Sequence, residues 1–369
     1  MILHITPGLN KGGAEKVLYT YLDSTTFHDQ CVLSLGPADD YYHKKIENLG
    51  CTIKSFNIRK RPINIIFFLV QVYKLRSTQI VGWMYYGALI SFILNMLRGE
   101  IKKTTLAIHH SDPDDITLKP LTRLVARTTC YLIRYFKLKT IFCADSAVAL
   151  HGQNLKESNI NVINNGYSPN DFFPSVLDRV KFRNKLGVSD DEFLIIFPAR
   201  FHPVKDHMTF FNAIKQLHSA NNISILLAGD GCDPENVELK KVLSVANIKF
   251  RVIMLGHLDN IRVAYNSSDL TVLSSISEAF PNVIVESLLS ETPCVSTDVG
   301  DVALILDEKF VFPVRDYISL SKLIHMMYKD FNSNRHGYNQ LKEKCRLSIE
   351  DKFTVQKMIS SYDKVIFSQ

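Results

Sequence analysis

The sequence predicts an α/β fold of two Rossmann-like, doubly wound domains that face each other across an interdomain cleft. Short apolar runs alternate with helix-like stretches along all 369 residues, which is the pattern of parallel sheets covered by helices. Hydrophobic residues make up 46% of the chain and charged residues 22%, values typical of a globular protein with a large buried core. The length suits two domains of ordinary size.

The predicted strands are the short apolar runs that lie between turn residues. In the first half they span residues 1–6, 31–35, 51–56, 79–84, 104–109, 140–145 and 160–163. In the second half they span residues 193–198, 223–228, 250–255, 270–274, 293–297 and 310–313.

The segment NNGYSPNDFFPS, residues 164–175, is rich in Asn, Pro and Ser and is predicted to be a linker. It separates a first domain, 1–168, from a second domain, 169–351. Residues 352–369 form an amphipathic pattern, and this helix could pack back on the first domain or lie on the second.

One uncharged apolar segment, residues 80–97, reaches the lower length limit of a transmembrane helix. Gly82 and Gly87 divide it, however, so we expect a buried strand over 79–84 followed by a helix over 88–97. The chain opens directly into a strand-like run, and a secretory signal is not expected.

The seven cysteines form no C-x-x-C pair, and their neighbours are mostly apolar. This pattern indicates reduced thiols in a cytosolic protein and argues against a disulfide framework or a zinc site. Charge is distributed unevenly, because residues 1–165 hold 20 Lys and Arg against 12 Asp and Glu, whereas the remainder holds 23 against 25. The basic first half predicts an acidic partner, such as a membrane surface or a phosphorylated substrate.

Ligands of open parallel sheets bind beyond the carboxyl ends of the strands, and the first candidate motif lies there. PGLNKGGAEKV, residues 7–17, follows the first strand and opens a helix. Gly12 and Gly13 allow close backbone approach, and the helix N-terminus offers N–H donors that suit a phosphate. An ordinary strand–helix turn explains the same residues equally well.

The second candidate motif, FPARFHPVKD, ends the first strand of the second half. Arg200 and Lys205 could together hold a diphosphate, or they could be two solvated charges. Two later strand ends, GDG at 229–231 and LGH at 255–257, have tight-turn chemistry and are not specific alone.

The stretch SEAFPNVIVES, residues 277–287, places two carboxylates eight positions apart. Pro281 fits the first turn of a helix over 281–290, with Glu278 before it and Glu286 within it. At helical rise their separation is ~12 Å at most, roughly the distance between the hexose and the ribose of a nucleotide-diphosphate sugar. Each carboxylate could accept hydrogen bonds from a vicinal hydroxyl pair, with the diphosphate between them.

These motifs together resemble the family 4 retaining glycosyltransferases (glycosyl transferases group 1) of the GT-B fold, whose E-x7-E signature matches Glu278 and Glu286. Other landmarks follow in order: Gly12–Gly13, NNG at 164–166, Arg200 with Lys205, GDG at 229–231 and TDVGD at 297–301. The resemblance covers essentially the whole chain and is most specific in its C-terminal half.

The resemblance implies a role for each matching residue. Glu278 would contact the donor sugar as the catalytic carboxylate, and Glu286 would contact the ribose. Arg200 and Lys205 would hold the diphosphate, assisted by Gly12, Gly13 and the backbone N–H groups of Phe280 and Asn282. Such enzymes need no cofactor and generally no metal, because cations and a helix N-terminus neutralise the leaving diphosphate.

The stretch LAIHHSDPDD, residues 106–115, ends another strand of the first half. The family often has a catalytic His here, and His110 matches that position better than His109, although a histidine pair is usually structural. The nearby Asp112, Asp114 and Asp115 could be mistaken for a metal site, but we read them as a solvated acidic loop.

Two basic, apolar stretches remain, residues 58–76 and 118–139. In the second, Arg123, Arg127 and Arg134 recur at helical spacing beside Leu, Tyr and Phe, as in an interfacial helix drawn to anionic lipid. Core helices with solvated basic edges are the alternative.

The sequence therefore predicts a retaining hexosyltransferase (EC 2.4) that acts at the cytoplasmic face of the membrane as a peripheral protein. Its acceptor would be a lipid-linked saccharide in the biosynthesis of a surface polysaccharide such as O-antigen or capsule. Two alternatives are a GT-B-fold sugar-nucleotide epimerase and a non-catalytic sugar-nucleotide-binding protein. Nucleic acid is not an expected partner, because no recognised reading motif accompanies the basic residues.

Overall fold

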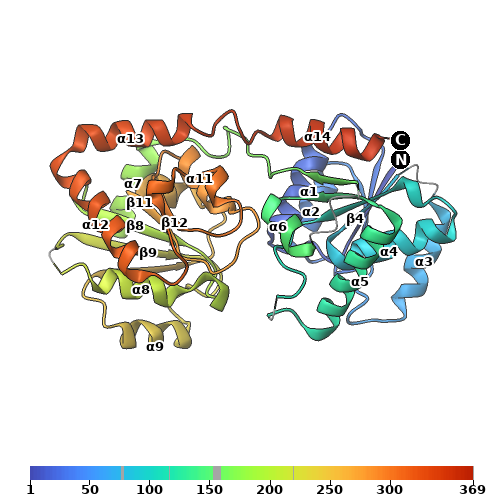
Figure 1. Cartoon of the computed structure of the whole chain (residues 1–369), viewed down its shortest axis with the longest axis horizontal. Coiled ribbons are helices and arrows are strands. Elements are labelled where there is room, and N and C mark those ends of the chain that lie inside the picture. The colour runs from blue at the N-terminus through green and yellow to red at the C-terminus, as the bar shows by residue number, and fades with distance from the viewer. Residues whose placement is uncertain (76–78, 116, 153–158, 219, 369) are drawn as a thin grey trace. The chain divides into compact units, whose positions relative to one another are not determined.

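The computed structural model describes residues 1–75, 79–115, 117–152, 159–218 and 220–368. By contacts the chain divides into two compact units (Figure 1). Unit 1 comprises Met1–Gly166 and Val355–Gln369, and unit 2 comprises Tyr167–Thr354. The first crossing between them lies within the Asn-rich segment 164–175, and each unit is described here by itself.

Unit 1 is built on a seven-stranded parallel sheet in the order β3-β2-β1-β4-β5-β6-β7. Its strands are β1 (Ile2–Thr6), β2 (Gln30–Ser34), β3 (Thr52–Ser55), β4 (Gln79–Trp83), β5 (Thr104–Ile108), β6 (Lys139–Phe142) and β7 (Ile160–Val162). Its helices are α1 (Gly13–Ser24), α2 (Tyr41–Asn48), α3 (Asn64–Lys74), α4 (Met84–Leu97), the 3-10 turn η1 (Ile101–Lys103), α5 (Pro120–Phe136), α6 (Asp145–His151) and α14 (Val355–Phe367).

The two faces of the unit 1 sheet carry separate hydrophobic clusters. Successive side chains of a strand point to opposite faces, so Ile2 joins the cluster under α1, α2 and α14, whereas Leu3 joins the cluster under α3 and α4. The C-terminal helix α14 thus belongs to unit 1 and buries Met358, Tyr362 and Ile366 there.

Unit 2 is built on a six-stranded parallel sheet in the order β10-β9-β8-β11-β12-β13. Its strands are β8 (Phe193–Pro198), β9 (Ile223–Ala228), β10 (Arg251–Gly256), β11 (Leu270–Leu273), β12 (Cys294–Thr297) and β13 (Val311–Phe312). Its helices are α7 (Val176–Leu186), η3 (Pro203–Lys205), α8 (His207–Lys215), α9 (Val237–Ala246), α10 (Arg262–Ser267), α11 (Asn282–Leu289), η4 (Val302–Leu304), η5 (Glu308–Phe310), α12 (Tyr317–Ser333) and α13 (Arg335–Leu347).

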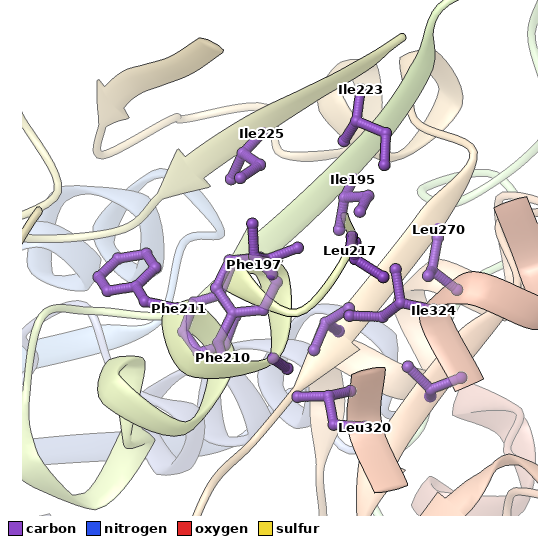
Figure 2. Close-up of a cluster of buried hydrophobic side chains, with 14 of the residues drawn as sticks. Ile195, Phe197, Phe210, Phe211, Leu217, Ile223, Ile225, Leu270, Leu320 and Ile324 are labelled. Carbon is purple, nitrogen blue, oxygen red and sulfur yellow. The ribbon is translucent and has the colours of Figure 1, made fainter. Parts of the chain in front are cut away.

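The main core of unit 2 fills the space between the sheet and α8 and α12. Figure 2 shows Ile195, Phe197 and Leu270 of the strands packing towards Phe210 of α8 and Ile324 of α12. The alternate residue Thr271 points to the other face, where its hydroxyl bonds Ser287 of α11 at 2.6 Å. Helices α8 and α11 therefore lie on opposite faces of the sheet (Figure 1).

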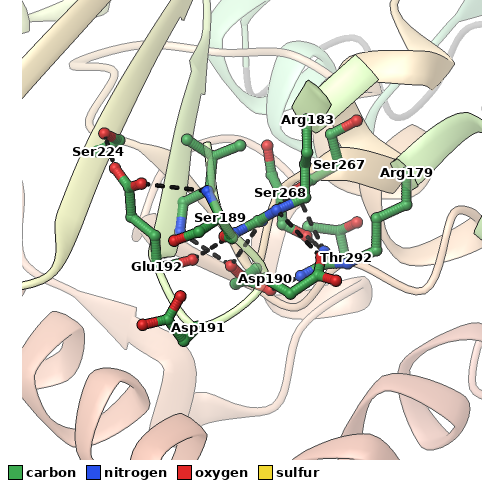
Figure 3. Close-up of polar contacts among 12 residues, drawn as sticks. Arg179, Arg183, Ser189, Asp190, Asp191, Glu192, Ser224, Ser267, Ser268 and Thr292 are labelled. Atoms are coloured by element: carbon green, nitrogen blue, oxygen red, sulfur yellow. Dashed lines mark hydrogen bonds and ion pairs between the residues drawn. The ribbon is translucent and has the colours of Figure 1, made fainter. Parts of the chain in front are cut away.

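A buried ionic network ties α7 to the start of β11 (Figure 3). Arg183 and Asp269 are almost fully buried, and their Nη1 and Oδ2 atoms lie 3.3 Å apart. Arg179 contacts Oδ1 of the same carboxylate at 2.8 Å. The Leu194 amide donates to Asp269 Oδ2 at 2.8 Å, so this side chain also fixes the start of β8.

All thirteen strands predicted from the sequence are present, with end points within three residues, and the two-domain α/β fold is confirmed. The segment 80–97 is also as predicted, with β4 followed by α4, although α4 begins at Met84, four residues earlier than expected. Among the described residues, no helix combines the length and apolar character needed to cross a bilayer.

Unit 1 should lose stability when the pH falls from about 6.5 towards 4, because burial lowers the pKa of His4, His109 and His151 to about 4. The unfolded chain takes up protons near the ordinary pKa of 6.5, whereas the folded chain does so only near 4. Stability is therefore complete above pH 6.5, and each histidine then removes up to ~1.4 kcal/mol per pH unit. Urea unfolding followed by the fluorescence of Trp83, the one tryptophan of the chain, measures this in unit 1.

Burial is the largest cause of the low pKa of His4, and the hydrogen bond to Gln30 opposes it. Its Nδ1 accepts from Trp83 Nε1 at 3.1 Å, so a proton there would face a donor, and its Nε2 bonds Gln30 Oε1 at 2.7 Å. Replacing His4 by Gln should flatten the pH dependence, whereas replacing the exposed His336 by Gln should not. Equal stability of the wild type at pH 7 and pH 5 would contradict this account.

Candidate functional site

Three loops of unit 2 meet at the carboxyl ends of β8, β9 and β10. The Phe201 amide donates to Asp230 O at 2.8 Å, and the Gly229 amide donates to Gly256 O at 2.8 Å. Gly229 has φ +150°, and a Cβ at this position would lie 2.5 Å from the Ala199 carbonyl carbon. The glycine of the GDG motif is therefore required for the close packing of these loops.

Lys205 and Glu278 meet at the carboxyl ends of β8 and β11. The Ile276 amide donates to Val204 O at 2.9 Å and the Ser274 hydroxyl to Asp206 O at 2.9 Å, which holds the two loops together. The Lys205 ammonium pairs with Glu278 Oε1, and both side chains are largely buried. Ser275 donates to the same oxygen at 2.6 Å. A cation, a carboxylate and a hydroxyl are thus brought to one point.

The TDVGD segment, residues 297–301, packs against the backbone of the Glu278 loop. Gly300 has φ +58°, and a Cβ there would lie 2.3 Å from Ala279 O and 2.6 Å from Glu278 O. The Asp301 amide donates to Ala279 O at 3.1 Å. Only glycine combines this backbone conformation with such close contact, so the motif serves to position Glu278.

Helix α11 follows the Glu278 loop and begins at Asn282, with Pro281 as its N-cap rather than in its first turn. Pro281 itself makes no side-chain capping hydrogen bond. The Asn282 amide donates to Phe280 O at 3.0 Å, so one of the two backbone donors expected for the diphosphate already has a partner. The Phe280 ring is buried against Phe353 at 5.2 Å between centroids, which anchors the turn.

Glu286 lies one turn inside α11 and is buried. The Tyr265 hydroxyl donates to Glu286 Oε2 at 3.3 Å. Burial and the nearby carboxylate raise the pKa of Tyr265 well above its ordinary value, so the hydroxyl keeps its proton at neutral pH. Sequence reasoning missed Tyr265, because it lies on α10, 21 residues before Glu286, and no local pattern links the two.

Arg200 lies two residues after the end of β8, and its side chain is exposed. Within the described part of the chain, no hydrogen bond or ion pair involves its guanidinium. On the loop after β10, His257 Nδ1 lies 3.2 Å from Asp230 Oδ1, and its Nε2 lies 3.6 Å from Asp259 Oδ1. The unit 2 candidates therefore comprise an exposed Arg200 and the more deeply placed Lys205, Glu278 and Glu286.

The glycine pair of unit 1 begins α1, with Gly12 as the N-cap and Gly13 as the first helical residue. The Glu15 carboxylate folds over this turn, since a Cβ on Gly12 would lie 2.2 Å from Glu15 Oε2. Burial raises the pKa of Glu15, and nearby Asp40 adds to the effect. A phosphate at Gly12–Gly13 would compete with this carboxylate for the same helix end.

The two histidines after β5 have different environments. His109 stacks on Trp83 with ring centroids 5.6 Å apart and bonds the Tyr362 hydroxyl at 3.0 Å. His110 is half-buried, its Nδ1 accepts from the Asp112 amide at 3.3 Å, and it lies near the Tyr85 ring. Both histidines follow the end of β5, and His109 is held between Trp83 and Tyr362, whereas His110 contacts the acidic loop.

The acidic loop after β5 is linked to α5. Asp114 accepts from Arg127 at 2.6 Å, and both side chains are exposed. Across the described residues, no group of three or more His, Cys, Asp or Glu side chains has an arrangement that could hold a metal ion. Arg123 and Arg134 lie on the same helix as Arg127, with Arg134 exposed. These residues and His110 belong to unit 1, whereas Arg200, Lys205, Glu278 and Glu286 belong to unit 2.

Comparison with known proteins finds similarity to one family model and to several curated proteins. Residues 178–344 match the family described as glycosyl transferases group 1. The chain is 26% identical over 193 residues to N-acetyl-alpha-D-glucosaminyl L-malate synthase of Bacillus anthracis, a match over 52% of this chain and 49% of that protein. It is 22% identical over 346 residues to UDP-Gal:alpha-D-GlcNAc-diphosphoundecaprenol alpha-1,3-galactosyltransferase of Escherichia coli, over 88% of this chain and 84% of that protein.

The fold is shared with solved glycosyltransferases of the GT-B type. The structure of Anabaena Alr3699/HepE in complex with UDP and glucose superposes with a TM-score of 0.84 and 17% identity, over 100% of this chain and 99% of that chain. In sequence, the chain spans about half the length of the first curated relatives it matches, 49% for the Bacillus anthracis synthase.

Proposed function

We infer that this chain, whose residues 178–344 belong to the glycosyl transferases group 1 family, is a glycosyltransferase that uses a nucleotide-diphosphate sugar. The observation that carries the inference is the cluster of Lys205, Ser275 and Glu278 directly before α11, with Glu286 buried within that helix. A cation beside one carboxylate, with a second carboxylate a helical turn beyond, suits a ligand with hydroxyl-bearing sugars on both sides of a diphosphate.

The proposed roles follow the positions of these side chains. Glu278 accepts hydrogen bonds from the donor sugar, and Glu286, oriented by Tyr265, accepts from the ribose. Lys205 and Arg200 bind the diphosphate together with the N-terminal end of α11, and His110 of unit 1 is the proposed catalytic histidine. Gly12 and Gly13 remain donor-site candidates only if the Glu15 carboxylate moves from the helix end.

The reaction we propose is transfer with retention of anomeric configuration, as in family 4. The bond between the anomeric carbon and the diphosphate oxygen breaks, and a bond from the acceptor oxygen to the same carbon forms on the same face. The acceptor proton passes to the leaving phosphate. Lys205 and Arg200 stabilise the charge that develops on this phosphate, so no metal is required.

For the acceptor we propose a lipid-linked saccharide, in the assembly of a surface polysaccharide such as O-antigen or capsule. The Escherichia coli relative supports this, because its name specifies a diphosphoundecaprenol-linked acceptor. The excess of basic residues in the first half supports a peripheral position on anionic lipid at the cytoplasmic face.

The function is tested by screening nucleotides and nucleotide sugars for thermal stabilisation, and then by following the products formed from those that bind. We expect one nucleotide diphosphate and its sugar to bind, and the sugar to be transferred or slowly hydrolysed with retention, with full activity in excess EDTA. An altered sugar nucleotide without transfer would identify an epimerase, and binding without turnover would identify a non-catalytic protein. Loss of activity in EDTA and recovery with Mg²⁺ or Mn²⁺ would refute the metal-independent mechanism.

We predict that Glu286→Ala weakens binding of the nucleotide diphosphate by roughly 10- to 150-fold, since hydrogen bonds to a charged group contribute about 1.5–3 kcal/mol. Tyr265→Phe should weaken it less, because the carboxylate remains and only its orientation is lost. Calorimetry of nucleotide binding measures both effects. Ser290→Ala is the matched control, because its hydroxyl donates to the Glu286 carbonyl at 2.9 Å and not to its carboxylate. Wild-type affinity in Glu286→Ala would exclude the ribose role.

A further inference from the structure

Helix α3 of unit 1 leaves most of its apolar side chains exposed. It buries only Phe68 and Val72, which join Leu3 in the cluster between the sheet and helices α3 and α4. The apolar residues of this segment that are at least 36% exposed are Ile63, Ile65, Ile66, Phe67, Leu69, Val70 and Tyr73. Among them, residues 63, 66, 67, 70 and 73 follow helical spacing and form one outward stripe, which we call the α3 outer face.

Every charged residue in the sequence around the α3 outer face is basic. Between Glu47 and Glu100 the sequence contains no Asp or Glu. It contains seven basic residues, namely Lys54, Arg59, Lys60, Arg61, Lys74, Arg76 and Arg98. Arg59, Lys60 and Arg61 lie exposed just before the helix, and Lys74 lies exposed at its end. An apolar helix face bordered by cations, with no anion in the surrounding sequence, has the composition of an interfacial helix.

The end of α4 extends the same surface. Arg98 Nη2 donates to Val72 O at 2.7 Å and to Leu75 O at 3.3 Å, which fixes the C-terminal end of α4 beside that of α3. Leu97 is 77% exposed there. Figure 1 shows α3 and α4 at the same side of unit 1. The exposed apolar surface is therefore larger than one helix and keeps its basic character.

We propose that the α3 outer face inserts into the interface of a bilayer containing anionic lipid, and that this face, rather than α5, is the membrane-inserting element. This rests on the proposed function, since it supplies the surface on which a lipid-linked acceptor would be reached. A second copy of the chain suits the face poorly, because two copies would bring the same cations together. Helix α5 also exposes apolar side chains, but it is less suitable for insertion, because the acidic loop 112–115 precedes it and Asp114 pairs with its exposed Arg127.

The insertion is tested with Phe67→Trp and vesicles of phosphatidylglycerol and phosphatidylcholine that carry brominated acyl chains. Native Trp83 is only 1% exposed and gives a constant background. We expect the brominated lipid to quench the fluorescence of Trp at position 67. Val245→Trp on α9 of unit 2 is the matched control, because Val245 is 77% exposed on a helix outside the proposed surface, and it should not be quenched. Equal quenching at both positions, or none at position 67, would overturn the proposal.

Cosedimentation with the same vesicles tests the affinity. The triple variant Phe67→Ser, Val70→Ser and Tyr73→Ser should bind about tenfold or more weakly, because apolar burial and electrostatic attraction act together in interfacial binding. The control Val237→Ser with Val245→Ser should bind as the wild type does. Unchanged vesicle binding of the triple variant, or a change in its oligomeric state instead, would contradict the assignment.

Nucleotide binding in lipid-free solution separates this proposal from the proposed function. The triple variant should bind the nucleotide diphosphate as the wild type does, which also shows that it is folded. If the wild-type protein binds the nucleotide but not the vesicles, the α3 proposal fails while the glycosyltransferase assignment remains. If the wild-type protein binds the vesicles but no nucleotide, the glycosyltransferase assignment fails while the α3 proposal remains.

Discussion

Replacing Asp269 with alanine is expected to destabilise unit 2 by about 3–5 kcal/mol, the cost of removing one partner of a buried ion pair. Its carboxylate accepts from Arg179, Arg183 and the Leu194 amide. Burial already lowers the pKa of Arg183, and Asp269 is the nearest charge that opposes this effect. Without Asp269, Arg179 and Arg183 are left with backbone carbonyl acceptors and the Leu194 amide loses its carboxylate, so the junction between α7, β8 and β11 should loosen.

Native-state hydrogen exchange measures this loss locally, because unfolding of a two-unit chain need not be two-state. Amide protection should fall in β8 and β11 of unit 2 and stay unchanged in β1 and β4 of unit 1. Asp190→Ala is the matched control, since Asp190 contacts the same Arg183 at 3.8 Å but is 81% exposed, and exposed pairs contribute little. If Asp190→Ala lowered amide protection as much as Asp269→Ala, burial of the ion pair would not determine how much it stabilises unit 2.

Replacing Glu278 with glutamine is expected to lower turnover roughly 10- to 150-fold, with a smaller effect on nucleotide binding. The substitution keeps the shape of the side chain and removes a charge-assisted hydrogen bond of about 1.5–3 kcal/mol, where each 1.36 kcal/mol is tenfold in rate. It also leaves the partly buried Lys205 without the carboxylate that it pairs with. Turnover of the donor found in the nucleotide-sugar screen measures the effect.

Two further variants show whether the effect belongs to the site. Ser275→Ala removes one hydrogen bond to the same carboxylate oxygen and should give a smaller loss of turnover in the same direction. Glu238→Gln changes an exposed carboxylate of α9, outside the cluster, and should have no effect. Normal turnover in Glu278→Gln would remove this residue from the catalytic role.

The sequence by itself determined the layout of the fold, because that layout depends on local patterns. Apolar runs of strand length followed by helical stretches identify every strand of both sheets. The glycines at 229 and 300 mark backbone conformations that other residues rarely adopt, so their motifs could be located without coordinates. The spacing of Glu278 and Glu286 is also local, because it depends on one loop and the first turn of the helix that follows it.

The tertiary structure alone decided which side chains meet. Lys205 and Glu278 are 73 residues apart, and their pairing depends on the neighbouring positions of β8 and β11 in the sheet. The contact of Tyr265 with Glu286 and the carboxylate of Glu15 over the glycine turn depend on packing in the same way. Exposure of α3 could not be predicted either, since its apolar residues suit a buried helix equally well. Only the position of a helix within its layer decides which of its faces is covered, because burial depends on neighbours that a local pattern does not specify.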